Sequence, residues 1–268
     1  MLNTAVEHYG RQATATALGL IAARRAWEQS ADRLLAVVTA LQVSVAAESA
    51  AAVPAMLEEQ GISPEPIAVV VPAALAGVAS DGRGLASLLA QAETRAQFDM
   101  IVETQLQDVA RHSAATAIAA RPQVAGYVRM VNPGACSRCI VLAGKFYRWN
   151  EGFKRHPKCG CRHIPAAENA AGDAGTDPIA YFDSMSVEQQ NRAFTAAGAE
   201  AIRMGADMGQ VVNARRGMQT AQVAGSQVVT TTSGSGRTPR LMPETILAIA
   251  RNRDDALRLL KLHGFITD

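Results

Sequence analysis

The residues best suited to chemistry gather in one short segment near the middle of the chain. They follow the pattern Cys136-x-x-Cys139, then His156-x-x-Cys159-x-Cys161-x-His163. Zinc takes four thiolate or imidazole ligands in a tetrahedron, and a Cys-x-x-Cys turn supplies two thiolates from one tight loop. The spacing therefore predicts a zinc site in which the second half of the pattern provides the remaining ligands.

Six candidates exceed the four positions of such a site. We expect Cys136, Cys139 and Cys161 to ligate, with either His156 or Cys159 as the fourth ligand and His163 as the least suited. Residues two apart on an extended chain point to opposite sides, so Cys159 and Cys161 can both ligate only if Gly160 bends the chain. Four protein ligands leave no position for water, which makes the predicted site structural rather than catalytic.

Three other interpretations of the cysteines stay open. They could form a reduced cluster without metal, or disulfides made after the protein leaves the reducing cytosol. A redox motif at Cys136 and Cys139 is the third, although no βαβ pattern surrounds it.

The same segment is rich in basic and aromatic residues. The basic candidates for contact with nucleic acid are Lys145, Arg148, Lys154, Arg155, Lys158 and Arg162, with four aromatic residues interleaved between positions 146 and 153. Cations would bind phosphates and rings would stack on bases. The competing interpretation is that the rings form the small core of a zinc knuckle while the charges are solvated.

The surrounding elements are predicted to be mainly helical. Residues 1–120 form an Ala-rich helical region that includes one long helix over 85–120. Residues 121–170 form a small α+β, zinc-knuckle-like domain with strands at 124–131 and 145–149 and a short helix at 136–143. Residues 171–268 form a helical C-terminal region, after a linker at 170–177, with a helix over 187–204 and a flexible or extended arm at 219–240 whose most mobile part is 233–236.

Composition limits the classes of protein to which this chain can belong. Of its 268 residues 49% are hydrophobic, but 52 are alanine and only 4% are aromatic, so the core contains little large apolar mass. A metal site, a partner or an assembly is expected to supply part of the stability. The net charge of +2 predicts neither a nucleic-acid binder nor a membrane-surface protein for the chain as a whole. The apolar runs at 34–47 and 67–79 are shorter than a bilayer span, and we expect a chain that is made in the cytosol without a membrane partner.

Familiar catalytic motifs are missing from the sequence. It contains no Gly-x-Ser-x-Gly, no His-Glu-x-x-His and no P-loop. We therefore assign no catalytic residue.

Several separate motifs, in order, resemble one known family. Cys136-Ser-Arg-Cys139-Ile-Val-Leu-Ala-Gly144, His156-Pro-Lys-Cys159-Gly-Cys161 and Pro165 are followed by motifs at 182–190, 196–207, 211–217, 240–246 and 256–264. Together they resemble the phage head morphogenesis family, the minor capsid proteins of the phage Mu F type, in the form found in phages of actinobacteria. The resemblance covers about residues 126–268, and the Ala-rich N-terminal half lies outside it.

The resemblance implies a structural protein of a tailed-phage head. Such a protein is made in the host cytoplasm, joins the procapsid and resides in the virion, in the head interior or at the portal. The implied partners are the portal, the major capsid protein and the scaffold protein. Some relatives are labelled capsid maturation proteases, so a protease that processes capsid or scaffold protein is the alternative. A protein that contacts double-stranded DNA and is packaged with the genome is a second alternative.

Overall fold

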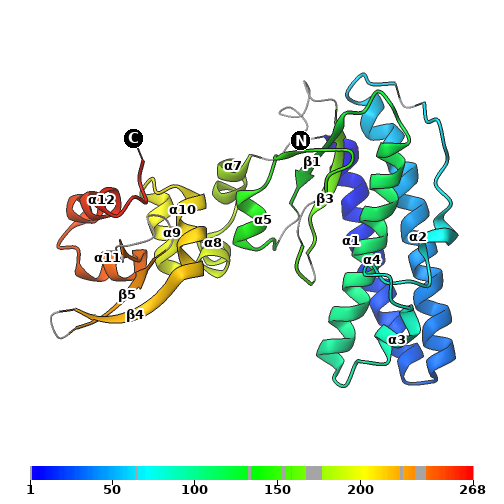
Figure 1. Ribbon diagram of the computed structural model, residues 1–268, viewed down its shortest axis with the longest axis horizontal. Helices are drawn as coiled ribbons and strands as arrows, with labels where there is room; N and C mark the ends of the chain where they lie inside the picture. The colour runs from blue at the N-terminus through cyan, green and yellow to red at the C-terminus, as the bar shows by residue number, and fades with distance from the viewer. Residues whose placement is uncertain are drawn as a thin grey trace. The chain divides into compact units, whose positions relative to one another are not determined.

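The computed structural model describes residues 2–63, 65–131, 134–152, 155–157, 159–166, 177–223, 226–232 and 240–267. It is mainly helical, as the sequence predicts, with two small sheets and a Cys/His-rich centre. Packing divides the chain into one unit of residues 1–132 with 143–177 and a second of 133–142 with 178–268 (Figure 1). This division differs from the three regions expected at 1–120, 121–170 and 171–268, because the strands and the short helix of the centre pack with different partners.

Three long helices form the bulk of the first unit. They are α1 (Asn3–Trp27), α2 (Ala31–Glu58) and α4 (Arg95–Ala119), which lie side by side with α2 packed along both of the others (Figure 1). Ser30 begins α2 by accepting a hydrogen bond from the Arg33 amide, as a helix N-cap does. Small side chains let the helices approach closely, and the larger apolar residues form separate core clusters along the bundle.

The helix expected over 85–120 is interrupted. The structure has a short α3 (Leu85–Leu89) and then α4, which begins at residue 95. Thr94 accepts a hydrogen bond from the Gln97 amide while the Gln97 side chain accepts one from the Thr94 amide. This capping box starts a new helix, and it explains why the periodic apolar pattern does not run through without a break.

A three-stranded antiparallel sheet completes the first unit. Its order is β2-β1-β3, with β1 (Gly126–Met130), β2 (Phe146–Arg148) and β3 (Arg162–Ala166). Both predicted strands are confirmed, whereas β3 was not expected. A Cβ on Gly126 would lie 2.0 Å from the carbonyl oxygen of Tyr147, so the close pairing of β1 with β2 requires glycine there.

The second unit has its own apolar core. It contains α5 (Ser137–Val141), α7 (Pro178–Asp183), α8 (Val187–Phe194), α9 (Ala196–Arg203), α10 (Met208–Ala214), α11 (Pro243–Ile249) and α12 (Arg253–Leu262). The phenylalanines Phe182, Phe194 and Phe265 are fully buried in this core together with Ile140 of α5. The short α5 that carries the Cys-x-x-Cys motif is therefore held by packing in the second unit.

One predicted helix of the second unit is two helices. The helix expected over 187–204 begins as predicted, with Ser186 capping α8, but the chain breaks at Thr195. Thr195 has a φ of 66°, and its hydroxyl accepts a hydrogen bond from the Gly198 amide at the start of α9. A threonine in this backbone region is rare, which is why helical periodicity could not reveal the break.

The arm expected at 219–240 contains a paired hairpin. Strands β4 (Met218–Val223) and β5 (Ser226–Thr231) pair antiparallel, and β6 (Arg240–Leu241) adds to β5. Gln219, Thr220 and Gln222 of β4 are exposed, whereas Thr230 and Thr231 of β5 are buried. Residues 233–236 and nearly all of the expected linker at 170–177 lie outside the described ranges.

Among the described helices, α2 is long and apolar enough to cross a membrane by length and composition. The central helix of a bundle satisfies the same criterion, and α2 is the helix against which α1 and α4 pack. The apolar run at 34–47 is shorter than α2 because it ends at a charged residue, whereas the helix continues beyond that residue.

Candidate metal centre

The first half of the cysteine pattern is a tight turn at the start of α5. The amides of Cys139 and Ile140 both donate to the carbonyl of Cys136, which turns the chain so that the two sulfurs face one another. Their Sγ atoms lie 3.6 Å apart, far beyond a bonded S–S distance of about 2.05 Å. The ligand-to-ligand edge of a tetrahedral zinc site with Zn–S bonds of about 2.3 Å is about 3.8 Å. The pair is therefore spaced as two thiolate ligands of one metal ion are spaced.

The second half of the pattern lies just before and at the start of β3. Cys159 and Cys161 are both buried, and their carbonyl oxygens accept hydrogen bonds from Arg111 Nη1 of α4 at 2.5 Å and 3.1 Å. The sulfur of Cys161 accepts a hydrogen bond from Arg129 Nη2 of β1 at 3.3 Å. All four cysteines are thiols in the structure.

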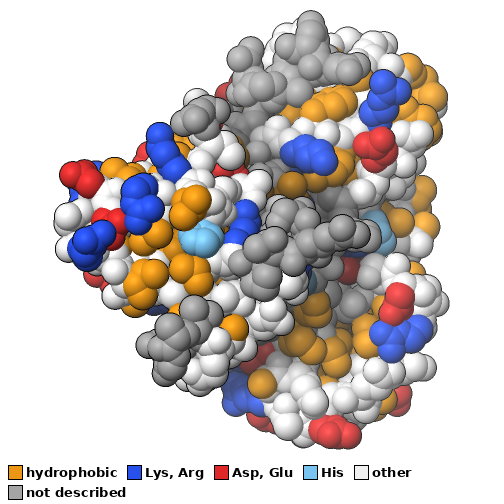
Figure 2. Space-filling model, turned by 60° about the vertical axis from the view of Figure 1, so that its left-hand side comes forward, with side chains coloured by type: hydrophobic (Ala, Val, Ile, Leu, Met, Phe, Trp, Pro, Cys, Tyr) orange, Lys and Arg blue, Asp and Glu red, His pale blue; other side chains and the backbone are white. Residues whose placement is uncertain are grey.

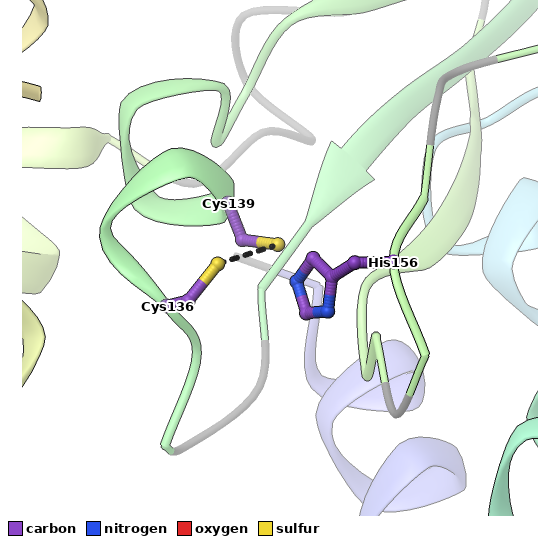
Figure 3. Close-up of side chains that lie close together, drawn as sticks. All are labelled: Cys136, Cys139 and His156. Atoms are coloured by element: carbon purple, nitrogen blue, oxygen red, sulfur yellow. Dashed lines mark hydrogen bonds between the residues drawn. The ribbon is translucent and has the colours of Figure 1, made fainter. Parts of the chain in front are cut away.

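Five of the predicted ligand candidates fall into two overlapping groups of three. Two overlapping groups have ligand atoms that all lie within 4.8 Å of one another: Cys136, Cys139 and His156, and Cys139, Cys159 and Cys161 (Figure 3). These Cys/His groups could hold a metal ion. Cys139 belongs to both groups, so it is the candidate common to either choice of ligands.

His156 has the hydrogen-bonding arrangement of a metal-binding imidazole. Its Nδ1 lies 2.8 Å from the carbonyl oxygen of Pro157, an oxygen that can only accept a hydrogen bond. In the neutral tautomer that has the proton on Nδ1, Nε2 has the lone pair that a metal ion needs. A histidine that ligates a metal commonly donates its other ring N–H to a carbonyl in this way.

His163 takes a different role, in keeping with its last place among the predicted ligands. It is buried, and its ring lies 4.0 Å from that of Tyr127 between centroids. Its carbonyl accepts a hydrogen bond from the hydroxyl of Tyr9. Burial lowers the pKa of His163 well below its ordinary value, so the ring is neutral at physiological pH.

Buried arginines surround the second half of the pattern. Two of them, Arg111 and Arg129, were not predicted from the sequence. Arg111 and Arg129 are each 2% exposed and Arg162 is 3% exposed. Burial, with a smaller contribution from the charge of Arg111, lowers the pKa of Arg162 to about 10, while Tyr9 and the nearby cysteines act in the opposite direction. The spacing Asp108-x-x-Arg111 on a helix is a signal for an ion pair, but it does not indicate that the pair is buried.

Asp108 links these cations to the helical bundle. One carboxylate oxygen accepts from Arg111 Nη2 and from Arg155 Nη1, and the other accepts from Ser80 Oγ at 2.6 Å. A buried carboxylate with three donors is fully satisfied. Asp108 therefore anchors both α4 and the segment that leads to Cys159.

The basic residues suggested for nucleic acid do not share one environment. Arg162 is buried and lies 5.8 Å from the ring of Tyr9, so it is not exposed to a phosphate backbone, which corrects its placement on such a surface. Arg155 is paired with Asp108 at 2.5 Å. Lys145 lies over the ring of Tyr147, and Arg148 is exposed. Lys154 and Lys158 lie outside the described residues.

Comparison with known proteins identifies a family for the greater part of the chain. No curated protein and no solved structure matches the sequence. The model of the VG15 protein family matches residues 2–187 of the 268, and that family is phage-associated. The match includes the whole helical bundle and all the cysteines. The chain therefore belongs to the VG15 protein family, which indicates a phage-encoded protein.

Proposed function

We propose that this chain is a minor structural protein of a tailed-phage head, added at the portal or inner capsid surface during procapsid assembly. Membership of a phage-associated family is the observation that carries the proposal. The ordered motifs of residues 126–268, which resemble those of the phage Mu F type, narrow it from a phage protein to a head component. The portal and the major capsid protein are the partners we propose, with the scaffold protein as a third.

Exposed apolar side chains support a role in assembly. In the first unit Ile67, Val69 and Val71 are 78%, 85% and 63% exposed, and Leu18 on α1 is 62% exposed. Hydrophobic side chains reach the surface at several places in the view of Figure 2. Neighbouring exposed apolar residues are typical of surfaces that another subunit covers.

We also propose that the Cys/His group binds one structural zinc ion. Thiolate sulfur and imidazole nitrogen are the donors that zinc prefers, and the 3.6 Å separation of the Cys136 and Cys139 sulfurs fits a tetrahedral edge. The remaining ligands come from His156, Cys159 and Cys161. Bound zinc would stabilise the fold, which compensates for a core with few aromatic residues.

The experiment that tests the head assignment is fractionation of assembled heads. Procapsids and mature heads of a phage that encodes the chain are purified on a density gradient and analysed by quantitative mass spectrometry. We expect the chain to sediment with both particles, in far fewer copies than the major capsid protein. Recovery only from the soluble fraction would contradict the proposal.

Matched variants connect this result to the structure. Val69→Asp places a charge in the exposed apolar segment of the first unit and is expected to reduce incorporation without unfolding the chain. Val187→Asp, at a residue of α8 that is 53% exposed, is the control and should be incorporated normally. Equal incorporation of both variants would remove the 67–71 segment from the proposed docking surface.

The same particles distinguish a structural protein from a protease. Each serine and histidine is replaced by alanine in turn, and cleavage of the capsid and scaffold proteins is followed by gel electrophoresis. We expect every folded variant to leave processing unchanged. Loss of processing with one folded variant would assign the chain to the protease class instead.

A further inference from the structure

The first unit contains more buried positive charge than buried carboxylate. Histidines aside, the buried charged residues of the described chain are Asp108, Arg111, Arg121, Arg129 and Arg162. Burying a guanidinium is unfavourable unless an anion lies beside it. Asp108 pairs with Arg111, and Arg129 donates to the sulfur of Cys161.

Three of the four arginines lie at the second half of the cysteine pattern. Arg111 donates to the carbonyl oxygens of Cys159 and Cys161, Arg129 donates to the Cys161 sulfur, and Arg162 follows Cys161 in the chain. Arg121 differs because its Nη1 donates to the carbonyl of Ala117 on its own helix. Three buried guanidinium groups thus lie close to Cys159 and Cys161.

Metal-bound thiolates would place negative charge beside these guanidinium groups. A divalent ion with three thiolates has a net charge of −1, and one with four thiolates has −2, because each ligating cysteine is deprotonated. A metal centre that includes Cys159 and Cys161 would therefore attract the buried guanidinium groups that lie beside these two cysteines.

We propose that Arg129 and Arg111 are positioning residues for the metal centre. Arg111 holds the backbone on both sides of Gly160, which fixes the bend that presents the two cysteines. Arg129 orients the Cys161 sulfur and compensates its charge when a metal is bound. Hydrogen bonds from outer residues to ligating atoms are known to tune metal affinity. This inference rests on the proposed binding of zinc.

The test compares arginine variants of the full chain, purified under reducing conditions. The dissociation constant for Zn²⁺ is measured by competition with a chromophoric chelator, and Co²⁺ is added separately to record the thiolate-to-cobalt charge-transfer spectrum. We expect Arg129→Met to weaken Zn²⁺ binding about 10- to 100-fold and to alter the cobalt spectrum. Arg129→Lys retains the positive charge but lacks the planar guanidinium group. Its affinity for Zn²⁺ should lie between those of the wild type and Arg129→Met. Arg121→Met, which removes a buried arginine that does not contact a cysteine, should bind as the wild type does.

The possible results separate failure of this inference from failure of the zinc proposal. If the wild type binds no metal, both this inference and the zinc proposal fail. If the wild type binds and Arg129→Met binds equally well with the same cobalt spectrum, the inference alone fails. If Arg129→Met does not fold, Arg129→Lys and Arg111→Lys decide, and wild-type affinity with an unchanged cobalt spectrum in both would overturn it.

Discussion

Asp108 and Arg111 lie one turn apart on α4 and form an ion pair in which both side chains are almost fully buried, with exposures of 9% and 2%. The same carboxylate also accepts hydrogen bonds from Arg155 and Ser80. Among the residues described, Asp108 is the single buried carboxylate, and it joins the bundle to the cysteine segment. Breaking a buried pair by removing one partner leaves an uncompensated charge, which costs more than the loss of an exposed pair.

We predict that Asp108→Asn lowers the free energy of unfolding by about 3–5 kcal/mol. The reason is that Arg111 stays buried without its anion. Urea denaturation followed by circular dichroism measures the change. Asp99→Asn is the matched control, because Asp99 pairs with Arg24 in a part-buried bridge, and it should cost about 1 kcal/mol or less. Equal effects of the two variants would show that burial of the Asp108 pair does not matter.

His8 predicts a pH-dependent stability in the acidic range. Burial, together with smaller contributions from the charges of Arg11 and Arg162, lowers its pKa to about 4. Glu48 lies 3.5 Å from Nδ1 and would favour protonation, but His8 Nδ1 has no hydrogen-bond partner and burial outweighs the carboxylate. As the pH falls, His8 is therefore protonated near pH 6.5 in the unfolded chain but only near pH 4 in the folded chain.

The contribution of His8 to stability is complete above pH 6.5 and is lost as the pH falls toward 4. Between pH 7 and pH 5 we expect the wild type to lose on the order of 1–2 kcal/mol more than His8→Gln. Denaturant titrations of both proteins at several pH values measure this difference. Parallel pH profiles would show that His8 is protonated equally in the folded and unfolded chains.

An aromatic pair packs at the end of the bundle where α1 ends and α4 begins. Phe98 of α4 is fully buried, and its ring stacks on that of Trp27 with centroids 4.4 Å apart. We predict that Phe98→Ala destabilises the protein by about 3–5 kcal/mol through loss of apolar burial and a cavity. Leu18→Ala, at an exposed residue of α1, should change the stability by about 0.5 kcal/mol or less. A thermal-melt comparison in which both variants match the wild type would argue against this packing.

Thr195 stores backbone strain between α8 and α9. Its φ of 66° and ψ of 162° fall in a region that glycine alone adopts readily. Thr195→Ala and Thr195→Gly both remove the capping hydroxyl, but only glycine relieves the strain. We therefore predict that the glycine variant is more stable than the alanine variant by about 1–3 kcal/mol in chemical denaturation. The opposite order would mean that the helix does not break at this residue.

Local sequence was sufficient to predict part of this structure. Strand β1 and the turn at Cys136 were predicted close to their observed bounds, because β-branched residues and a Cys-x-x-Cys motif are strong local signals. Strand β3 was not, because Arg162 and His163 are polar residues that the fold buries. Their burial depends on Arg111, Tyr9 and Tyr127, which are distant in the sequence.

The candidate site divides in the same way. The ligand candidates could be predicted from residue type and spacing, and the structure places five of them in two overlapping groups. The arginines that contact Cys159 and Cys161 could not, since a single arginine in an Ala-rich helix or a short strand has no pattern that indicates burial. Tertiary packing alone brings Arg111 to the carbonyl oxygens of Cys159 and Cys161, and Arg129 to the Cys161 sulfur.

The most direct test of the proposed zinc centre is the metal content of the full chain, purified under reducing conditions without added metal and measured by inductively coupled plasma mass spectrometry. We expect about one zinc ion per chain. We also expect little zinc in the Cys136→Ser/Cys139→Ser double variant and a large fall in the thermal midpoint when zinc is removed by a chelator. A wild-type protein that is folded, stable to chelation and contains far less than one metal ion per chain would contradict it.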